Sequence, residues 1–219
     1  MIEHGDREEK LITDCTLPAL DLDFRTLGSD NNYPVVFENC TFDGPISAVD
    51  ADVTVPIQFE NCEIGEFDLE GARFEFDIEL ENSTVTGEVN AFEARFDDRF
   101  DVRGSTFTAP VALNETRFDN DADFDGATFE APASFKTASF SGASNELGDN
   151  ASFEGTTFEA EADFHQGTFT YADFANATFG ARAGFEETVF TGDAEFPDAT
   201  FEGHADFDEV DFGEDVDFS

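Results

Sequence analysis

Basic residues are scarce in this chain of 219 residues, which has 10 Lys and Arg against 52 Asp and Glu and a formal net charge of −42. Only Lys10 and Lys136 are lysines. Because such a chain repels phosphate groups, the composition argues against direct nucleic-acid binding through a basic surface. Anionic membrane surfaces would repel it for the same reason.

Long apolar runs are also missing from the sequence. The N-terminal segment MIEHGDREEK has no apolar core of the kind that a signal peptide needs. No stretch approaches the roughly 18 apolar residues of a membrane-spanning helix. We therefore predict a cytoplasmic chain without membrane insertion, in which the sequons at Asn39, Asn82, Asn114, Asn150 and Asn176 carry no glycan.

Tryptophan is absent, and the chain has only two Tyr and one Met, yet it contains 29 Phe. The hydrophobic fraction of 40% is too high for simple disorder. An ordinary core mixes several apolar residue types to fill an irregular volume. A core dominated by one residue type therefore indicates one environment that is repeated many times.

The phenylalanines recur at steps of five or six residues, mostly in alternation. From Phe118 onward they occupy positions 118, 124, 129, 135 and 140, and then 153, 158, 164, 169, 174, 179, 185, 190, 196, 201, 207, 212 and 218. We call these positions the centres, and the position two residues before each centre the small slot, because it usually holds Ala. Helices and flat strands have shorter apolar periods, so the pattern predicts short extended segments joined by corners.

The same steps continue toward the N-terminus with more varied residues. Upstream of Phe118 the centres are Leu113, Phe107, Val102, Phe96, Ala91, Val85, Leu80, Phe74, Leu69, Ile64, Phe59, Val53, Ala48, Phe42 and Phe37. Four steps sum to about 22 residues, and the tetrapeptide Phe-Glu-Asn-Cys recurs at the same interval, at 37–40 and 59–62. We therefore predict one continuous array with about 22 residues per coil.

Tracts such as ADFDGATFEAPASFKTASF (122–140) and ADFHQGTFTYADFANATF (162–179) resemble the pentapeptide-repeat family, and its Phe-centred branch in particular. The resemblance covers residues 37 to 218. It implies an all-β fold, a right-handed quadrilateral parallel β-helix in which the central Phe and the small residue two before it point inward. It implies no chemistry, because members of this family have different roles.

The register also predicts the boundaries. Residues 1–16 are expected to form a polar tail and residues 17–219 a single β-helix, whose register is clear from residue 37. Leu17, Leu22 and Leu27 mark a first coil, and the turn-rich segment 28–34 interrupts the register. A small loop is expected near 141–150, with Leu147 at the missing centre. The sequence stops inside a repeat, which leaves three alternatives: a fragment, a frayed last coil, or an end-to-end homodimer through the uncapped C-terminal coil.

Few residues suggest chemistry. Cys15, Cys40 and Cys62 lie in small slots and are expected to be buried thiols, with Cys40 stacked directly on Cys62. Their spacing matches no metal site, and the histidines at positions 4, 165 and 204 lie far apart. Outward acids could line up and hold Ca²⁺ or Mg²⁺, although generic counterion binding is the expected outcome. These acids are Asp121, Asp123, Asp125, Asp163, Asp173 and Asp206. We predict no catalytic residue, no cofactor and no specific metal.

Two interpretations of the acidity remain open, namely adaptation to multimolar salt and imitation of DNA. Because acid is spread along the whole chain, the first is favoured, and it points to a halophilic source. The predicted function is a non-catalytic scaffold that contacts an unknown protein partner. One alternative is a DNA mimic that acts on a type II topoisomerase such as gyrase. The other is a soluble repeat portion of a longer membrane-associated protein.

Overall fold

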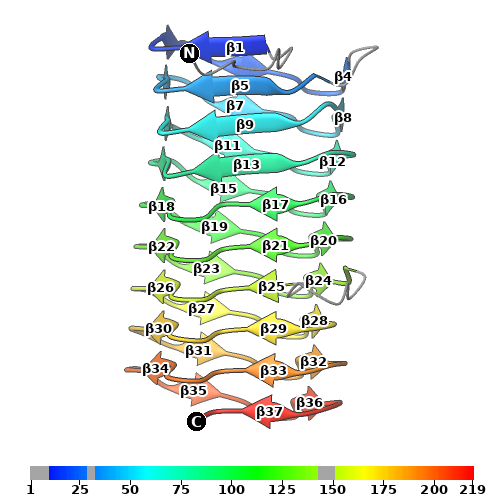
Figure 1. Ribbon diagram of the computed structural model, residues 1–219, viewed down its shortest axis with the longest axis vertical. Helices are drawn as coiled ribbons and strands as arrows, with labels where there is room; N and C mark the ends of the chain where they lie inside the picture. The colour runs from blue at the N-terminus through cyan, green and yellow to red at the C-terminus, as the bar shows by residue number, and fades with distance from the viewer. Residues whose placement is uncertain (1–9, 29–32, 143–150) are drawn as a thin grey trace, which may run out of the picture.

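The repeats fold as a stack of coils. The computed structural model describes residues 10–28, 33–142 and 151–219. About nine coils of about 22 residues surround one continuous core, and the two ends of the chain lie at opposite ends of the stack (Figure 1). The described residues contain strands and no helix. The predicted quadrilateral parallel β-solenoid is confirmed.

Four parallel sheets run along the stack, one on each side, and we name them A to D in the order in which the chain visits them. Sheet A has ten strands: β1 (Lys10–Thr13), β5 (Val35–Glu38), β9 (Ile57–Glu60), β13 (Ile78–Glu81), β17 (Phe100–Asp101), β21 (Ala122–Asp123), β25 (Ala151–Ser152), β29 (Ala172–Asp173), β33 (Ala194–Glu195) and β37 (Val216–Asp217). Sheet B has nine: β2 (Thr16–Leu17), β6 (Thr41–Phe42), β10 (Glu63–Ile64), β14 (Thr84–Val85), β18 (Thr106–Phe107), β22 (Thr128–Phe129), β26 (Thr157–Phe158), β30 (Thr178–Phe179) and β34 (Thr200–Phe201).

The remaining two sheets also have nine strands each. Sheet C consists of β3 (Leu20–Asp21), β7 (Ile46–Ser47), β11 (Phe67–Asp68), β15 (Val89–Asn90), β19 (Val111–Ala112), β23 (Ala133–Ser134), β27 (Ala162–Asp163), β31 (Ala183–Gly184) and β35 (Ala205–Asp206). Sheet D consists of β4 (Thr26–Gly28), β8 (Asp52–Thr54), β12 (Arg73–Phe74), β16 (Arg95–Phe96), β20 (Arg117–Phe118), β24 (Ser139–Phe140), β28 (Thr168–Phe169), β32 (Val189–Phe190) and β36 (Asp211–Phe212).

Two corners of every coil need a residue in the left-handed backbone region. Between sheets A and B these residues are Asp14, Asn39, Asn61, Asn82, Gly104, Gly126, Gly155, Asn176 and Asp198. Between sheets C and D they are Phe24, Asp50, Gly71, Glu93, Glu115, Thr137, Gln166, Glu187 and Glu209. Gly, Asn and Asp adopt this region most easily, so the A–B corner follows local preference closely. The C–D corner accepts larger side chains, because stacking on both sides holds its backbone in place.

Every centre predicted between Phe37 and Phe196 that lies in the described residues is buried. The Phe rings form ladders along the stack, as between Phe153 and Phe174, whose centroids are 4.8 Å apart with an interplanar angle of 7°. At some sides of the coils a smaller centre is accompanied by a larger residue in the small slot. Ile46 precedes Ala48 and Phe100 precedes Val102, whereas Ala122 precedes Phe124. These coil sides therefore fill their part of the core in one of two ways.

The N-terminal boundary differs from the predicted one. Residues 10–16 belong to the solenoid, because β1 pairs in parallel with β5 and β2 begins at Thr16. Ile12 lies five residues before Leu17 and so continues the repeat step, but the short apolar pair of Leu11 and Ile12 after a polar segment gave little signal. The predicted first coil at Leu17, Leu22 and Leu27 corresponds to β2, β3 and β4. Leu147, part of the segment 28–34 and nearly all of the loop at 141–150 lie outside the described residues.

Candidate functional site

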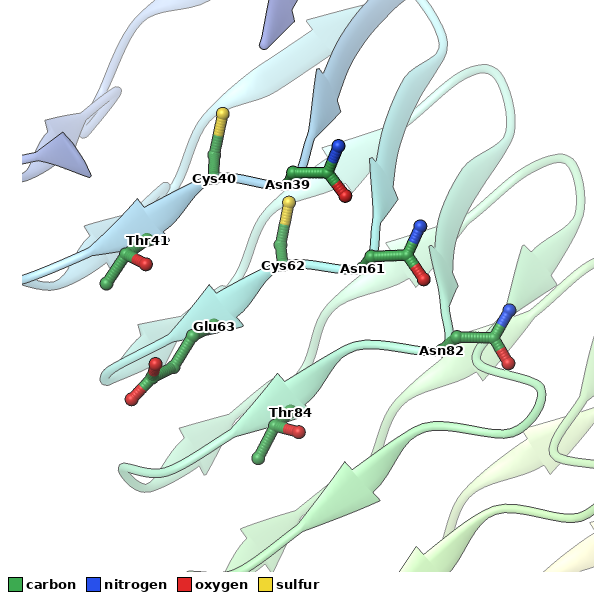
Figure 2. Close-up of a pocket in the computed structure, with 8 residues that line it drawn as sticks. All are labelled: Asn39, Cys40, Thr41, Asn61, Cys62, Glu63, Asn82 and Thr84. Atoms are coloured by element: carbon green, nitrogen blue, oxygen red, sulfur yellow. The ribbon is translucent and has the colours of Figure 1, made fainter. Parts of the chain in front are cut away.

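A shallow groove of about 480 Å³ follows the A–B corner over three coils. Figure 2 shows how it is built: asparagines form one wall, outward residues of sheet B form the other, and two thiols lie between them. The lining residues are Asn39, Asn61, Asn82, Cys40, Cys62, Thr41, Glu63 and Thr84. The groove is polar and open; two coils contribute three consecutive residues each, and the third contributes Asn82 and Thr84.

Three consecutive positions at the A–B corner explain why sequons occur there. Asn39, Asn82 and Asn176 occupy the left-handed position, where an amide side chain is tolerated. The next residue fills a small slot, and the one after it begins a strand of sheet B with an outward Thr. The pattern Asn-x-Thr therefore arises from the geometry of the corner. The sequon at Asn114 differs, because its Thr116 is buried, and Asn150 lies outside the described residues.

The three cysteines share one inward column, because sheet B aligns Thr16 with Thr41 and Thr41 with Glu63. The Sγ atoms of Cys15 and Cys40 are 3.1 Å apart. The Cys62 thiol instead donates to the carbonyl oxygens of Phe37 and Glu60, at 3.3 and 3.5 Å. The prediction that Cys40 and Cys62 are buried, on adjacent coils, is confirmed, whereas Cys15 is only partly buried. All three are free cysteines.

Polar side chains elsewhere in the small slots donate hydrogen bonds to the coil before. Ser83 Oγ donates to the carbonyl of Phe59 at 3.3 Å, and Ser105 Oγ donates to that of Leu80 at 2.6 Å. On the other side of the core, Thr116 and Thr188 donate in the same way to Ala91 and Phe164. These contacts satisfy buried hydroxyls and join the coils, so they have a structural role.

Sheet B carries a column of outward threonines. Its members are Thr16, Thr41, Thr84, Thr106, Thr128, Thr157, Thr178 and Thr200, and Glu63 interrupts the series. The equivalent position on sheet A holds acids in most coils from β13 onward, including Glu79, Asp101 and Asp123. Sheet B therefore presents an uncharged strip on a strongly acidic protein. Sequence reasoning missed this strip, although a Thr before the centre in almost every coil was a readable signal.

An ion-pair cluster lies on the outer face of sheet A. Asp101 is fully buried, and its Oδ2 lies 2.9 Å from Arg99 Nη2 and 2.8 Å from Arg103 Nη2. Arg99 Nη2 also contacts Asp123 Oδ2 at 2.9 Å. Burial raises the pKa of Asp123, and hydrogen bonding to Asp101 raises the pKa of Arg103. The two arginines compensate a charge that burial alone would make costly.

A second group of bases forms a column on sheet D. Arg73, Arg95 and Arg117 are aligned on three adjacent coils. Arg95 pairs with Asp97 on its own coil, and its Nη2 lies 2.6 Å from Asp119 on the next. The acids two residues further along each coil pair with these stacked arginines and so reduce the repulsion between like charges. Five of the ten basic residues, at 73, 95, 99, 103 and 117, thus gather on the central coils.

The outward acids predicted as a ladder are divided between two faces. Asp123 and Asp173 lie on sheet A, separated by Ser152, and Asp163 and Asp206 lie on sheet C, separated by Gly184. Asp163 pairs with Lys136 at 2.9 Å. Within the described ranges, no group of three or more His, Cys, Asp or Glu side chains is arranged to hold a metal ion.

The described histidines do not come together either. His165 follows β27 and His204 precedes β35, on sheet C two coils apart, and His204 Nε2 lies 3.8 Å from Asp206. His4 lies outside the described residues. In the part of the chain that the structure describes, no helix is long and apolar enough to cross a bilayer.

A parallel solenoid of four sheets with a Phe ladder and small slots defines the class of protein. A family model described as "Pentapeptide repeats (9 copies)" matches residues 37–84, 146–189 and 185–219, which is more than half of the chain. The chain belongs to the pentapeptide-repeat family. No curated protein matches it.

Proposed function

We propose that the protein is a non-catalytic scaffold that contacts a protein partner through sheet B. The threonine column is the observation that carries this proposal. A hydroxyl and a methyl group at almost every coil offer a regular surface that a partner can cover without desolvating charge. The acid columns of sheets A and C would cost much more to cover.

The test compares two faces of the same protein. Thr128→Glu with Thr157→Glu places charge in the threonine column, and Ser134→Glu places charge on sheet C, at a similarly half-buried position. Cross-linking in a lysate of the source, at its working salt, identifies proteins bound to the parent chain. We expect the sheet B variant alone to lose them. Equal loss, or no loss, in the two variants would contradict a contact through sheet B.

We further propose that the acidity is an adaptation to high salt. Acids flank the sheets throughout the stack instead of forming one patch, and at about 1 M salt the Debye length falls to roughly 3 Å. The test is far-UV circular dichroism with thermal melting from low salt to about 3 M KCl. A rise in melting temperature with salt supports adaptation, and an unchanged melting temperature contradicts it.

Imitation of DNA is the second candidate function, and the acids at the outward position of sheet A favour it. They include Glu79, Asp123, Asp173, Glu195 and Asp217. The arginine column on sheet D weighs against it, because a DNA backbone has no basic strip. If the purified protein leaves the supercoiling activity of gyrase unchanged at the working salt of the source, this candidate is excluded.

End-to-end association is a separate proposal. In the last coil, Val216 and Phe218 are 40% and 51% exposed. A second copy stacked on this coil would cover the apolar side chains and the open strand edges. Analytical ultracentrifugation of the parent chain and of Phe218→Asp tests this, with a dimer expected only for the parent. A monomeric parent chain at high salt would contradict it.

A further inference from the structure

The cysteine column holds two sulfur atoms close enough to be joined. Cys15 Sγ and Cys40 Sγ are 3.1 Å apart across two adjacent coils, and their residues are 25 apart in sequence. Their strands β2 and β6 are paired in parallel, which keeps the two Cα atoms within the range that disulfides span. Cys15 is only partly buried, so a small reagent can reach it from the first coil.

We propose that Cys15 and Cys40 form a reversible disulfide that fastens the first coil of the solenoid to the second. Cys40 has two sulfur neighbours in its column, but its geometry favours one. Figure 2 shows the Cys40 and Cys62 side chains lying parallel, both directed toward the preceding coil, and the short sulfur contact of Cys40 is the one with Cys15. The Cys62 thiol donates to the carbonyl of Phe37, the role that Ser83 has one coil further along.

The reaction balances with a peroxide as the oxidant. The Cys15 sulfur, after losing its proton, attacks one peroxide oxygen, the O–O bond breaks, and hydroxide leaves as water, which gives a sulfenic acid. The Cys40 sulfur then attacks the Cys15 sulfur, the S–O bond breaks, and a second water leaves with the Cys40 proton. The two thiols together lose two electrons and two protons, and the peroxide is reduced to two waters.

The surroundings make the reaction slow at neutral pH. The hydrogen bond with Cys40 raises the pKa of Cys15 to about 11, and burial and the nearby Cys62 and Asp14 act in the same direction. Since the thiolate is the nucleophile, the pair resists brief exposure to mild oxidant and reacts faster as the pH rises. The first coil is the one that gains from a covalent link. Leu11 and Ile12 are 48% and 37% exposed there, and Phe24 is 74% exposed.

The test uses the full chain, hydrogen peroxide and three serine variants. Serine is a matched replacement, because Ser83 and Ser105 already occupy the same slot in later coils. Intact mass and peptide mapping without reductant are followed over time. We expect the parent chain and Cys62→Ser to lose the mass of two hydrogen atoms and to yield a peptide pair linked through Cys15 and Cys40. Cys15→Ser and Cys40→Ser should yield no linked peptide pair over the same time.

A second measurement asks whether the bridge holds the first coil in place. Limited proteolysis within residues 10–28 should slow by at least about tenfold after oxidation and recover with a reducing thiol. A link between Cys40 and Cys62, a bridge between two copies, or oxidation of Cys15→Ser at the parent rate would overturn the proposal. So would a bridged chain that is cleaved as fast as the reduced one.

Discussion

The N-terminal coils, residues 10–28 and 33–113, and the C-terminal coils, residues 118–142 and 151–219, build the same solenoid from different cores. On sheet C the centres of the first set alternate Leu22, Ala48, Leu69, Ala91 and Leu113. Those of the second set are Phe135, Phe164, Phe185 and Phe207. The residues in the small slots change in size in the opposite sense. They are Ile46, Phe67, Val89 and Val111 in the first set and alanine in every later coil. On this sheet larger residues in the small slots therefore accompany the aliphatic centres, and neither position requires a particular residue.

The two sets also differ in what fills their cores. The N-terminal coils contain an internal cavity of about 10 Å³ among side chains that include Leu20, Ala48, Phe67 and Leu69. In the C-terminal coils the rings of Phe164 and Phe185 stack with centroids 4.9 Å apart. Mixed aliphatic side chains can adjust to a change in volume, whereas a stacked ring has two fixed neighbours. The C-terminal core should therefore tolerate truncation less well.

Truncating a stacked ring should have the largest effect. Phe164 is fully buried and stacks on Phe135 and Phe185, with centroids 4.8 and 4.9 Å away. Because neither neighbour can collapse into the cavity, we expect Phe164→Ala to lower the free energy of unfolding by about 3–5 kcal/mol. Leu69→Ala, beside the adaptable Phe67, should cost about 2–3 kcal/mol. Denaturant unfolding at fixed salt measures both.

Thr157→Ala, on the outward column of sheet B, is the surface control and should change the free energy of unfolding by less than about 0.5 kcal/mol. Amide hydrogen exchange should place the loss for Phe164→Ala in the neighbouring coils, since contacts in a solenoid are local. A larger cost for Leu69→Ala than for Phe164→Ala would show that the C-terminal core adjusts more readily than the N-terminal one.

The ion pairs of the two sets differ in the burial of their acidic partners. Arg103 faces Asp101, whose side chain is fully buried, whereas Arg182 in the C-terminal coils pairs with Glu161, whose side chain is 48% exposed. We expect Arg103→Met to cost about 2–3 kcal/mol, because a buried carboxylate loses one of its two bases. Arg182→Met should cost less than about 1 kcal/mol. Thermal melting of both variants at one salt concentration tests the difference.

Adding Asp101→Asn to Arg103→Met removes the buried charge, so the double variant should recover part of the loss. A double variant less stable than Arg103→Met alone would mean that Asp101 stabilises the fold mainly through its hydrogen bonds. One such bond is given by the Arg103 amide, which donates to Asp101 Oδ1 at 3.1 Å.

The sequence predicted most of the fold because the inward positions repeat. Steps of five and six residues located the buried centres from Phe37 onward, and the 22-residue interval gave the size of the coil. The coil at Lys10–Thr13 was missed, since an end coil has one neighbour and its apolar residues stay partly exposed. The pairing of Cys15 with Cys40 was also missed. Their separation of 25 residues departs from the repeat, and side-chain direction cannot be read from spacing.

Exchanging the small-slot residue and the centre on one coil of sheet C tests directly whether their volumes compensate each other. On sheet C, Val111 and Leu113 are followed one coil later by Ala133 and Phe135. Phe135→Leu leaves space and should cost about 1–2 kcal/mol. Adding Ala133→Val copies the N-terminal pair into the C-terminal core, and we expect it to restore at least half of the loss. Denaturant unfolding of the single and double variants measures the recovery, and a double variant below the single one would contradict such compensation.

The pH dependence should show the smallest effect, with opposite signs for buried and for exposed acids. Burial raises the pKa values of Asp77 and Glu79 above their ordinary values of 3.8 and 4.5, so the folded state binds protons more tightly there than the unfolded state. Their contribution to stability is therefore present at low pH and lost as the pH rises through the raised values. Asp217 has the opposite sign, because hydrogen bonds from Ser219 lower its pKa, and its contribution is lost on acidification.

Acidification from pH 7 toward the ordinary range of carboxyl groups should raise the melting temperature of the parent chain, because Asp77 and Glu79 bind protons more tightly in the folded state than in the unfolded state. Lower net charge adds to this rise in any variant, so the comparison with Asp77→Asn/Glu79→Gln isolates the two groups. We expect the double variant to gain at most about 2 °C less than the parent chain over this interval. An equal or larger gain in the double variant would mean that the net charge alone sets the pH dependence. In that case the buried acids of the N-terminal coils and the exposed Asp217 would not differ in their linkage to folding.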